Sequence, residues 1–317
     1  MPPNPLKPFY RHAPIRSLDT LADVLEVTRV QLERLARNAD RMYRPVPQTK
    51  KDGSERMTWD AFRQLKAIHQ LIKVRILTKA TYPLYLQGGI RDCENPRDHV
   101  RNAGIHAGQS CVINEDISDF FPSTSADQVR DIWEHFFRFP PEVADCLTSL
   151  TTRRGKLPQG AKTSNYLANL TFWRNEHELV RHLNANSWKY SRLTDDITVS
   201  FPVPVSRPRK SQIVSILYAF IKRNGYRPKY RKHDIFDSNE QMLVNNLVVN
   251  KRPALPQNER HVIRGLVHQT IRQLQDGSNE SVLVSLPKVL GKIGKLKRLH
   301  RRTGERLNTS LIRALGR

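Results

Sequence analysis

The chain has 317 residues, 38% of them hydrophobic, which is enough for one large or two to three smaller units with real cores and excludes a disordered protein. Its 53 lysines and arginines against 30 aspartates and glutamates give a net charge of +23, which predicts a polyanionic partner and favours nucleic acid over an anionic membrane surface. No apolar run approaches the ~20 residues of a membrane span and the N-terminus lacks the apolar core of a signal peptide, so we expect a cytoplasmic protein with no membrane partner.

Two short helices are predicted near the N-terminus, with Ser17 and Thr28 as their N-caps. Thr28 and Gln31 have the spacing of a capping box, and leucines at helical intervals supply the apolar faces. We expect these helices to be packing elements only.

A basic β-hairpin is predicted at residues 43–57, where two short extended runs flank an Asp-Gly pair. Its Lys50 and Arg56 have the charge to bind a phosphate chain, although a solvated, charged turn is the simpler interpretation of the hairpin taken alone. A helix is predicted to follow at about residues 58–79. We expect residues 80–109 to be loop with short helical pieces.

A buried strand is predicted at Ser110–Asn114, and it leads directly into Glu115 and Asp116. An acid at the end of an apolar strand is held rigidly, as a metal ligand must be, and Asp116 has this position. Glu115 is expected on the opposite strand face, as a solvated or ion-paired acid. Ser125 and Gln128 then predict the capped start of another helix.

Two later turns carry polar side chains. Leu157-Pro-Gln-Gly160 is predicted to be a rigid turn before a helix, and the runs at 189–193 and 197–201 predict a tight hairpin with Asp195 and Asp196 at its tip. Adjacent carboxylates repel each other, which raises one pKa, and a divalent cation such as Mg²⁺ removes the repulsion. Taken alone, Asp-Asp is more simply an ordinary turn dipeptide.

The C-terminal part is predicted to be a separate unit. A Pro- and Arg-rich link leads into a helix around Ile213–Arg223, and Gln241–Asn250 predict a short strand pair. Beyond a boundary near residues 238–256 the chain is helical and basic. Its amphipathic last part is either a solvated helix or one that lies on a nucleic-acid duplex, with phosphate contacts from Lys292, Lys295 and Arg298.

The order of these motifs resembles the palm of reverse transcriptases. Residues 113–123 look like the first palm motif with Asp116 as metal ligand, and residues 193–196 stand at the catalytic Tyr-x-Asp-Asp box. Phe121 falls where the family places the bulky side chain that rejects a ribose 2′-hydroxyl. Gln159 is similar to the glutamine that contacts the incoming nucleotide. The chain departs from the family at Leu193, where tyrosine is usual.

The resemblance also implies residues that bind the triphosphate. Lys50 and Arg56 match the basic fingers residues that hold it, and Asp119 either lies beneath it or caps the turn and helix. Lys232 lies near the lysine proposed as the acid for pyrophosphate departure, although the basic residues beside it are interchangeable with it as a phosphate-binding run.

Within that family, the chain resembles the bacterial retron reverse transcriptases. Their Asn-Ala-x-x-His signature is matched by Asn102, Ala103 and His106. We expect the histidine to be a structural hydrogen-bonding residue and not a catalyst. In the second signature, where these enzymes carry Val-Thr-Gly, this chain has Val244, Asn245 and Asn246. This change bears on RNA recognition more than on catalysis.

The resemblance implies an α+β fold of the right-hand polymerase type. Residues 1–109 would form N-terminal helices and fingers, residues 110–240 the palm with part of the fingers at 125–160, and residues 241–317 a basic, helical thumb. The implied enzyme is an RNA-directed DNA polymerase in which Asp116, Asp195 and Asp196 hold two Mg²⁺ ions, or Mn²⁺ as a substitute, for phosphoryl transfer.

The implied partners are dNTPs and a cognate structured noncoding RNA, which the enzyme would copy in part from an RNA 2′-hydroxyl primer to give a branched RNA–DNA product. Retron enzymes also imply a role in antiphage defence, with a separate effector protein and a higher-order assembly.

Two alternatives stay open from the sequence. Another bacterial reverse transcriptase, of the intron-encoded or phage-exclusion type, would use a different RNA or make untemplated DNA, and residues 102–106 argue against it. An inactive RNA-binding protein on a polymerase fold is the second alternative, and it would have no need for three acids and Gln159.

Overall fold

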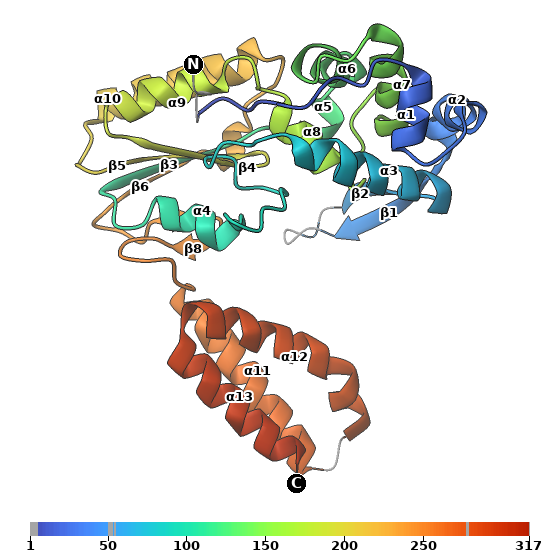
Figure 1. Ribbon diagram of the computed structural model, residues 1–317. Helices are drawn as coiled ribbons and strands as arrows, with labels where there is room; N and C mark the ends of the chain where they lie inside the picture. Colours follow the sequence, from blue (N-terminus) through green and yellow to red (C-terminus); the bar gives the residue numbers. More distant parts are fainter. Residues whose placement is uncertain (1–5, 50–52, 54, 277–278, 317) are drawn as a thin grey trace.

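A computed structural model gives the structure of the chain, and it describes residues 6–49, 53, 55–276 and 279–316. A body of helices and antiparallel strands carries a bundle of three helices at its C-terminal end (Figure 1). The predicted combination of helices with antiparallel sheets is therefore confirmed. Within these ranges, no helix has both the length and the apolar character needed to cross a membrane.

A four-stranded antiparallel sheet forms the centre of the body. Its strand order is β4-β5-β3-β6, so strands distant in sequence become neighbours. β3 (Cys111–Asp116) lies between β5 (Asp196–Phe201) and β6 (Asp234–Asp237), and β4 (Lys189–Leu193) forms one edge. The strands predicted at 110–114, 189–193 and 197–201 are confirmed to within two residues.

The two faces of this sheet have different covers (Figure 1). The helices α9 (Glu176–Ala185) and α10 (Arg207–Arg223) lie over one face, and α10 begins six residues before the predicted start. The short helix α4 (His99–Ile105) and the small hairpin of β7 (Leu243–Val244) and β8 (Leu247–Val248) lie on the other side.

The alternation of side chains along β5 explains this arrangement. Ile197, Val199 and Phe201 are fully buried in the large core that includes α9 and α10. Thr198 and Ser200 point to the opposite face, because successive side chains of a strand alternate. Both are buried as well, so the side chains that α4 and its neighbours cover are largely polar.

The N-terminal part confirms the predicted caps. Ser17 caps α1 (Leu18–Val24), and Thr28 forms the predicted capping box at the start of α2 (Arg29–Asn38). A second capping box, at Ser125, starts α6 (Ala126–Asp131). A π-helical turn (Ile132–Phe136) and α7 (Pro141–Thr151) follow, and α7 lies beside α1 and α2.

The predicted basic hairpin is present, but the helix expected at 58–79 is wrong at its start. β1 (Tyr43–Thr49) pairs with β2 (Glu55–Ala61), and α3 covers only Arg63–Arg75. Thr58 and Trp59, which have high strand propensity, continue the ladder. The Thr58 hydroxyl donates to the Val46 carbonyl at 2.8 Å, and this pairing across the hairpin outweighs the helical spacing of the apolar residues.

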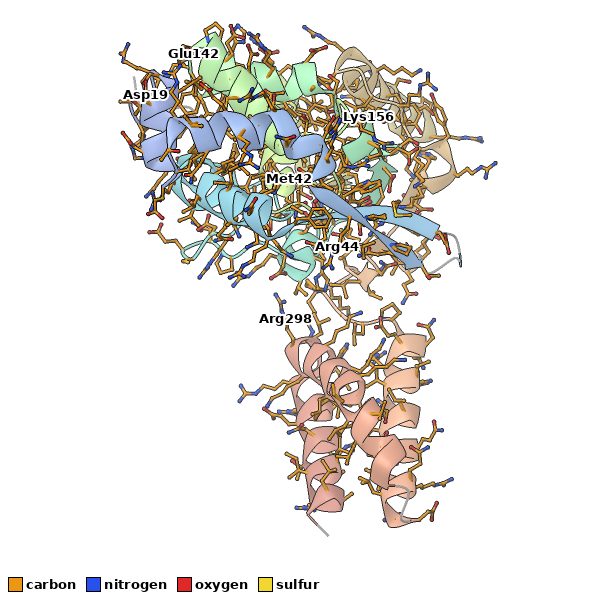
Figure 2. All side chains as sticks on the ribbon, turned by 90° about the vertical axis from the view of Figure 1, so that its right-hand side faces the viewer. Asp19, Met42, Arg44, Glu142, Lys156 and Arg298 are labelled. Atoms are coloured by element: carbon orange, nitrogen blue, oxygen red, sulfur yellow. The ribbon has the colours of Figure 1, made fainter. Side chains whose placement is uncertain are left out.

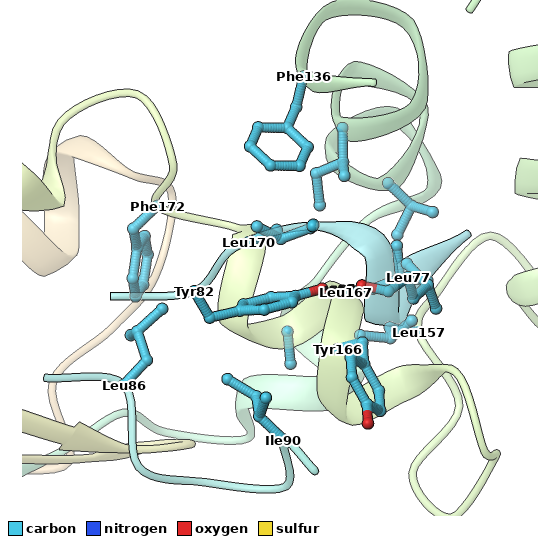
Figure 3. Close-up of a cluster of buried hydrophobic side chains, with 14 of the residues drawn as sticks. Leu77, Tyr82, Leu86, Ile90, Phe136, Leu157, Tyr166, Leu167, Leu170 and Phe172 are labelled. Atoms are coloured by element: carbon cyan, nitrogen blue, oxygen red, sulfur yellow. Dashed lines mark hydrogen bonds between the residues drawn. The ribbon is translucent and has the colours of Figure 1, made fainter. Parts of the chain in front are cut away.

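The core of the body surrounds α8 (Ser164–Leu170), the helix that follows the predicted rigid turn. Figure 3 shows Leu167 and Leu170 of α8 among apolar side chains from several distant segments. Tyr82 lies in the same cluster, and its hydroxyl donates to the Leu77 carbonyl at 3.0 Å. This cluster fixes the loop that carries Tyr82 and Leu86 against α8 and the sheet.

The C-terminal bundle consists of α11 (Gln257–Gln275), α12 (Asn279–Leu299) and α13 (Arg301–Leu315). Its apolar core is continuous with that of the α4 side of the body. One hydrophobic cluster contains residues of the bundle together with residues of α4, β3 and the small hairpin, among them Ala103, Val112, Val244, Ile263, Val289 and Leu307.

Candidate active site

Pairing of β3 with β5 brings three acids together. Asp116 and Asp196 are direct partners in the register of the two strands. The Ile117 amide donates to the Asp195 carbonyl at 3.1 Å, which closes the end of the ladder. Thr194 turns the chain with a left-handed φ of +63°, so that Asp195 lies at the tip between β4 and β5. We call residues 189–201 the acid hairpin.

Burial makes the charged forms of these acids unfavourable. Asp116 is only 2% exposed, and burial raises the pKa of Asp195, with the charge of Asp116 adding to the effect. Burial, followed by the charges of Asp195 and Asp116, raises the pKa of Asp196 to about 7. The site therefore disfavours three free carboxylates and favours a compensating positive charge.

Lysines supply part of that charge. The Lys232 ammonium donates to Asp116 Oδ2 at 2.5 Å, and the Lys229 ammonium lies 3.7 Å from Asp116 Oδ1. Burial is the largest single influence and works to lower the pKa of Lys232, but the hydrogen bond to Asp116 and the charges of the three acids together outweigh it, so the pKa is raised. Across the residues that the structure describes, no three His, Cys, Asp or Glu side chains are arranged to hold a metal ion as they stand.

A buried ion pair supports the acid hairpin from the α9 side. Arg192 of β4 is fully buried and forms two hydrogen bonds with the carboxylate of Glu176 on α9, at 2.6 and 2.8 Å. The same guanidinium donates to the Thr194 carbonyl at 2.9 Å. Tyr190 also donates to Glu176, at 2.7 Å. The backbone just before the acids is thus fixed to α9.

A glycine loop supports the hairpin tip. A β-carbon at Gly88 would lie 2.3 Å from the Thr194 hydroxyl and 2.5 Å from the Thr194 amide nitrogen, so only glycine fits. Asn169 of α8 donates to the Gly88 carbonyl at 2.6 Å and holds this loop in place. The close approach explains the glycine at position 88, in a segment that was predicted to be loop with short helical pieces.

His106, just after α4, joins the two strands of the acid hairpin. Its Nδ1 lies 2.7 Å from the Ser200 hydroxyl on β5, and its Nε2 lies 2.7 Å from the Ser191 hydroxyl on β4. Burial lowers the pKa of His106 to about 3, so the ring is neutral near pH 7. The expectation that His106 is a structural hydrogen-bonding residue is confirmed.

The two signatures meet at the acids. Asn102 of α4 is fully buried and donates to Asn245 Oδ1 at 2.5 Å, and Asn245 donates in turn to Asp196 Oδ2 at 3.4 Å. Ala103 and Val244 are buried in the cluster shared with the C-terminal bundle. Asn246, the other residue of the turn, is exposed.

The residues predicted to contact the nucleotide differ in how deeply they are buried. Phe121 is 8% exposed and contacts Phe120, so both rings belong to the core. Gln159 is half-buried, and its carbonyl accepts a 2.7 Å hydrogen bond from the Trp59 amide, which ties the rigid turn to β2. Gly160 has a φ of +111° in that turn.

Asp119 is exposed, with a left-handed φ of +46°. It stands at the N-cap position of α5 (Phe120–Ser123), but its side chain makes no capping hydrogen bond and accepts instead from the Ser118 hydroxyl at 3.2 Å. Of its two open interpretations, capping of the helix by the side chain is therefore wrong. Arg56 is exposed on β2 and donates to Gln48 at 3.3 Å. Lys50 lies outside the described residues.

Two of the three basic residues predicted on the last part of the chain are in ion pairs. Lys295 donates to Glu259 of α11 at 2.7 Å, and Arg298 donates to Asp98, the N-cap of α4, at 2.7 Å. Lys292 is half-buried on α12. The first pair joins helices of the bundle, and the second joins the bundle to the body.

Glu115 lies on the opposite strand face from Asp116, as expected, but it is not solvated. It is 2% exposed and pairs with His233 Nδ1 at 2.6 Å. Burial raises the pKa of Glu115, and hydrogen bonds from His233 and then Tyr218 act against that rise. The structure therefore pairs Glu115 with His233 and contradicts the solvated alternative.

The sequence interpretation missed the residues that hold the acids in place. Arg192, Glu176 and Gly88 make the contacts described above, and none of them was predicted to be a site residue. One local signal existed. Tyr190 and Arg192 are two residues apart on the predicted strand, so their side chains lie on the same face, and a buried tyrosine there places the arginine at a position facing the core. A charged residue in such a position requires a buried partner.

Several known proteins are similar to this chain, although no protein-family model matches it. The "Retron Se72 reverse transcriptase" of Salmonella heidelberg is 34% identical over 269 residues, which cover 83% of this chain and 69% of that protein. The "Retron Ec48 reverse transcriptase" of Escherichia coli is 30% identical, covering 92% of this chain and 75% of that protein. The "Retron Ec86 reverse transcriptase" of Escherichia coli is 27% identical over 79% of this chain and 78% of that protein.

Proposed function

This chain belongs to the retron reverse transcriptases, which are RNA-directed DNA polymerases, and we propose that Asp116, Asp195 and Asp196 are its catalytic acids. The observation that carries the proposal is the register of β3 against β5, which places Asp116 directly opposite Asp196. Two motifs far apart in sequence thereby form one acidic centre. Membership of this family sets aside an enzyme of the intron-encoded or phage-exclusion type. Against an inactive RNA-binding protein, the support is that the three acids and Gln159 are all present.

We propose that the body contains the fingers and palm and that the C-terminal bundle is the thumb. In this assignment the central sheet and its covering helices are the palm, and the β1–β2 hairpin with its neighbouring helices is the fingers. The bundle has the basic, amphipathic character that a duplex-binding thumb requires, since phosphate contacts depend on lysine and arginine.

The acids fit two Mg²⁺ ions by their chemistry. They are hard oxygen donors, and Asp116 Oδ1 is buried with no hydrogen-bond partner among the described residues. Divalent ions bound here would activate the primer hydroxyl and stabilise the charge that develops on the transferred phosphoryl group. Mn²⁺, a similarly hard ion, is the expected substitute.

The protein's own residues have separable tasks in this proposal. Arg192 and Gly88 fix the backbone of the acid hairpin, and Lys232 neutralises Asp116. Arg56, on β2, would bind the triphosphate, and the resemblance gives Lys50, which lies outside the described residues, the same task. Gln159 would orient the incoming nucleotide, and Phe121 would exclude a ribose 2′-hydroxyl from beside the acids.

We further propose that the template is a cognate structured noncoding RNA, primed from an RNA 2′-hydroxyl to give a branched RNA–DNA product. The net charge of +23 supports a large polyanionic partner. A role in antiphage defence would require a separate effector, with which the enzyme and its product would assemble.

Extension of a primed RNA template with labelled dNTPs tests the catalytic assignment. The double substitution Asp195→Asn and Asp196→Asn should abolish DNA synthesis, because it removes the paired negative charge while preserving shape. The matched control is Asp234→Asn, which changes an exposed acid on β6 of the same sheet and should leave synthesis intact. DNA synthesis by the double variant would refute the proposal, and sequencing of co-purified nucleic acid would identify the RNA.

A further inference from the structure

The helix α4 and the residue after it place three side chains in contact with three different parts of the molecule. Asn102 and His106 are four residues apart and therefore lie on the same face of the helix, which is turned toward the sheet. Asn102 reaches the small hairpin, His106 reaches the acid hairpin, and Ala103 lies in the apolar cluster shared with the C-terminal bundle.

His106 contacts both strands that flank the acid pair. Each ring nitrogen has one serine hydroxyl at 2.7 Å, from Ser191 on β4 and from Ser200 on β5. A neutral imidazole has one donor and one acceptor, and a hydroxyl can fill either role, so both contacts are satisfied without a charge. The imidazole therefore fixes the two strands to the end of α4.

Asn102 reaches Asp196 through one intermediate. Asn245 accepts from Asn102 at 2.5 Å and donates to Asp196 Oδ2 at 3.4 Å. Asn245 and Asn246 have left-handed φ angles of +49° and +62°, the geometry of a two-residue hairpin turn. Asn114 of β3 donates to the Leu243 carbonyl at 2.8 Å, which anchors this turn beside the acids.

The other end of α4 is joined to the C-terminal bundle. One oxygen of Asp98 accepts the amides of Val100 and Arg101 at 2.8 and 2.9 Å and so caps the helix. The second oxygen accepts from Arg298 of α12 at 2.7 Å. Figure 2 shows Arg298 at the end of the bundle that faces the body. The Asp98 carboxylate thus caps α4 and also binds the C-terminal bundle.

We infer that α4 is a positioning element that connects the C-terminal bundle to the acid pair, with Asn102, Asn245 and His106 as positioning residues. The inference rests on the proposed role of Asp195 and Asp196. It predicts that loss of the Asn245 amide loosens the acid hairpin and slows the chemical step, with little effect on nucleotide binding. It also predicts that the Arg298–Asp98 pair influences the acid hairpin in the absence of RNA.

Amide hydrogen exchange on the metal-free, RNA-free chain tests this directly. The first variant is Asn245→Gly, which removes the side chain and keeps the left-handed turn, since glycine adopts that conformation freely. Peptides from residues 189–201 should exchange about tenfold faster than in the unmodified chain, as expected for the loss of one supporting hydrogen bond. The β1–β2 hairpin should be unchanged. The control for exchange is Asn246→Gly, the exposed neighbour in the same turn.

Arg298→Ala provides the second arm. Because Arg298 is also a candidate phosphate contact, this variant is examined by exchange alone. Residues 99–105 and 189–201 should both exchange faster. Exchange of residues 189–201 that stays within about twofold of the unmodified chain in either variant, or acceleration spread evenly over all peptides, would overturn the inference.

Steady-state kinetics separate positioning from binding. For Asn245→Gly we expect kcat to fall about tenfold while KM for dNTP stays within about twofold, because a displaced reactive group lowers the rate of the chemical step. An unchanged kcat would count against the inference. If the Asp195 and Asp196 variant retained DNA synthesis, the catalytic assignment would fail on its own, and the exchange data would still decide whether α4 controls the hairpin.

Discussion

The guanidinium of Arg192 donates a 2.9 Å hydrogen bond to the carbonyl oxygen of Thr194, the residue immediately before the acid pair. The same side chain is fully buried and held by Glu176. An arginine on the surface is flexible, whereas this one is held by hydrogen bonds to Glu176 and to the Thr194 carbonyl. The backbone position of the acids in this reverse transcriptase therefore depends on a charge pair that is itself buried in the core.

Breaking this pair should cost both stability and activity. Glu176→Gln or Arg192→Met leaves one buried charge without a partner, so we expect a loss of about 3 kcal/mol in the free energy of unfolding and at least a tenfold fall in DNA synthesis. Arg192→Lys should rescue little, because lysine lacks the planar fork. Urea unfolding and primer extension measure the two effects. As control, Arg29→Lys at an exposed ion pair should leave the urea midpoint nearly unchanged.

Gly88→Ala should displace the hairpin tip. The added methyl group would lie 2.3 Å from the Thr194 hydroxyl, so the loop or the tip must move. We expect kcat to fall about tenfold or more, with a loss of about 1–3 kcal/mol in stability from overpacking. Gly265→Ala on α11, where nothing lies within 4 Å, is the comparison, and it should be neutral or slightly stabilising. Equal kinetics for the two variants would contradict the role given to Gly88.

The buried His106 makes stability depend on pH in mild acid. Its pKa is lowered to about 3 in the folded chain by burial, whereas the unfolded chain has an ordinary histidine. As pH falls below about 6.5, the unfolded chain takes up a proton that the folded chain does not, so folding stability declines. Near pH 5 the effect of this one residue approaches about 2 kcal/mol.

Urea midpoints at about pH 7.5 and pH 5 measure this dependence. His106→Gln should be less stable than the unmodified chain near pH 7.5 but should lose less on acidification. Buried His69, whose pKa is lowered to about 4, acts in the same direction and leaves part of the slope in place. A slope that His106→Gln does not reduce would show that the ring is protonated in the folded chain.

Chelation of divalent ions should affect the Lys232→Gln variant more than the unmodified chain. Lys232 is the cation in direct contact with Asp116, so its removal leaves the three acids less compensated in metal-free protein. We expect a larger gain in melting temperature on adding Mg²⁺ to this variant after treatment with EDTA. Lys229→Gln, whose ammonium lies farther from Asp116 at 3.7 Å, should show a smaller gain. Identical gains in melting temperature for the unmodified chain and the two variants would show that Lys232 does not compensate the charge of the acids.

The acid hairpin was predictable because its signals are local. Short β-prone runs on both sides of Asp195 and Asp196 predicted two strands with a turn between them, and the structure reproduces this almost residue for residue. The motif order then predicted that Asp116 would join them. The register of β3 against β5 confirms their proximity.

What the sequence could not show depends on contacts between distant segments. Thr58 and Trp59 fit a helix by spacing, but they continue β2 because β1 is beside them. Arg192 is buried only because Glu176 arrives from another helix. The hydrogen bond between Asn102 and Asn245 joins two signatures, and nothing in the sequence of either segment predicts that they are in contact.

The hydrophobic cluster that runs from α4 through the small hairpin into the C-terminal helices has a consequence for evolution. Residues 257–316 are not a module that relatives can exchange freely, since their apolar surface is shaped to fit Ala103, Val112 and Val244. Recombination at residue 256 would join two surfaces that had never been selected together. Productive chimaeras between retron enzymes should therefore inherit α4, the 243–248 hairpin and the last three helices from a single parent.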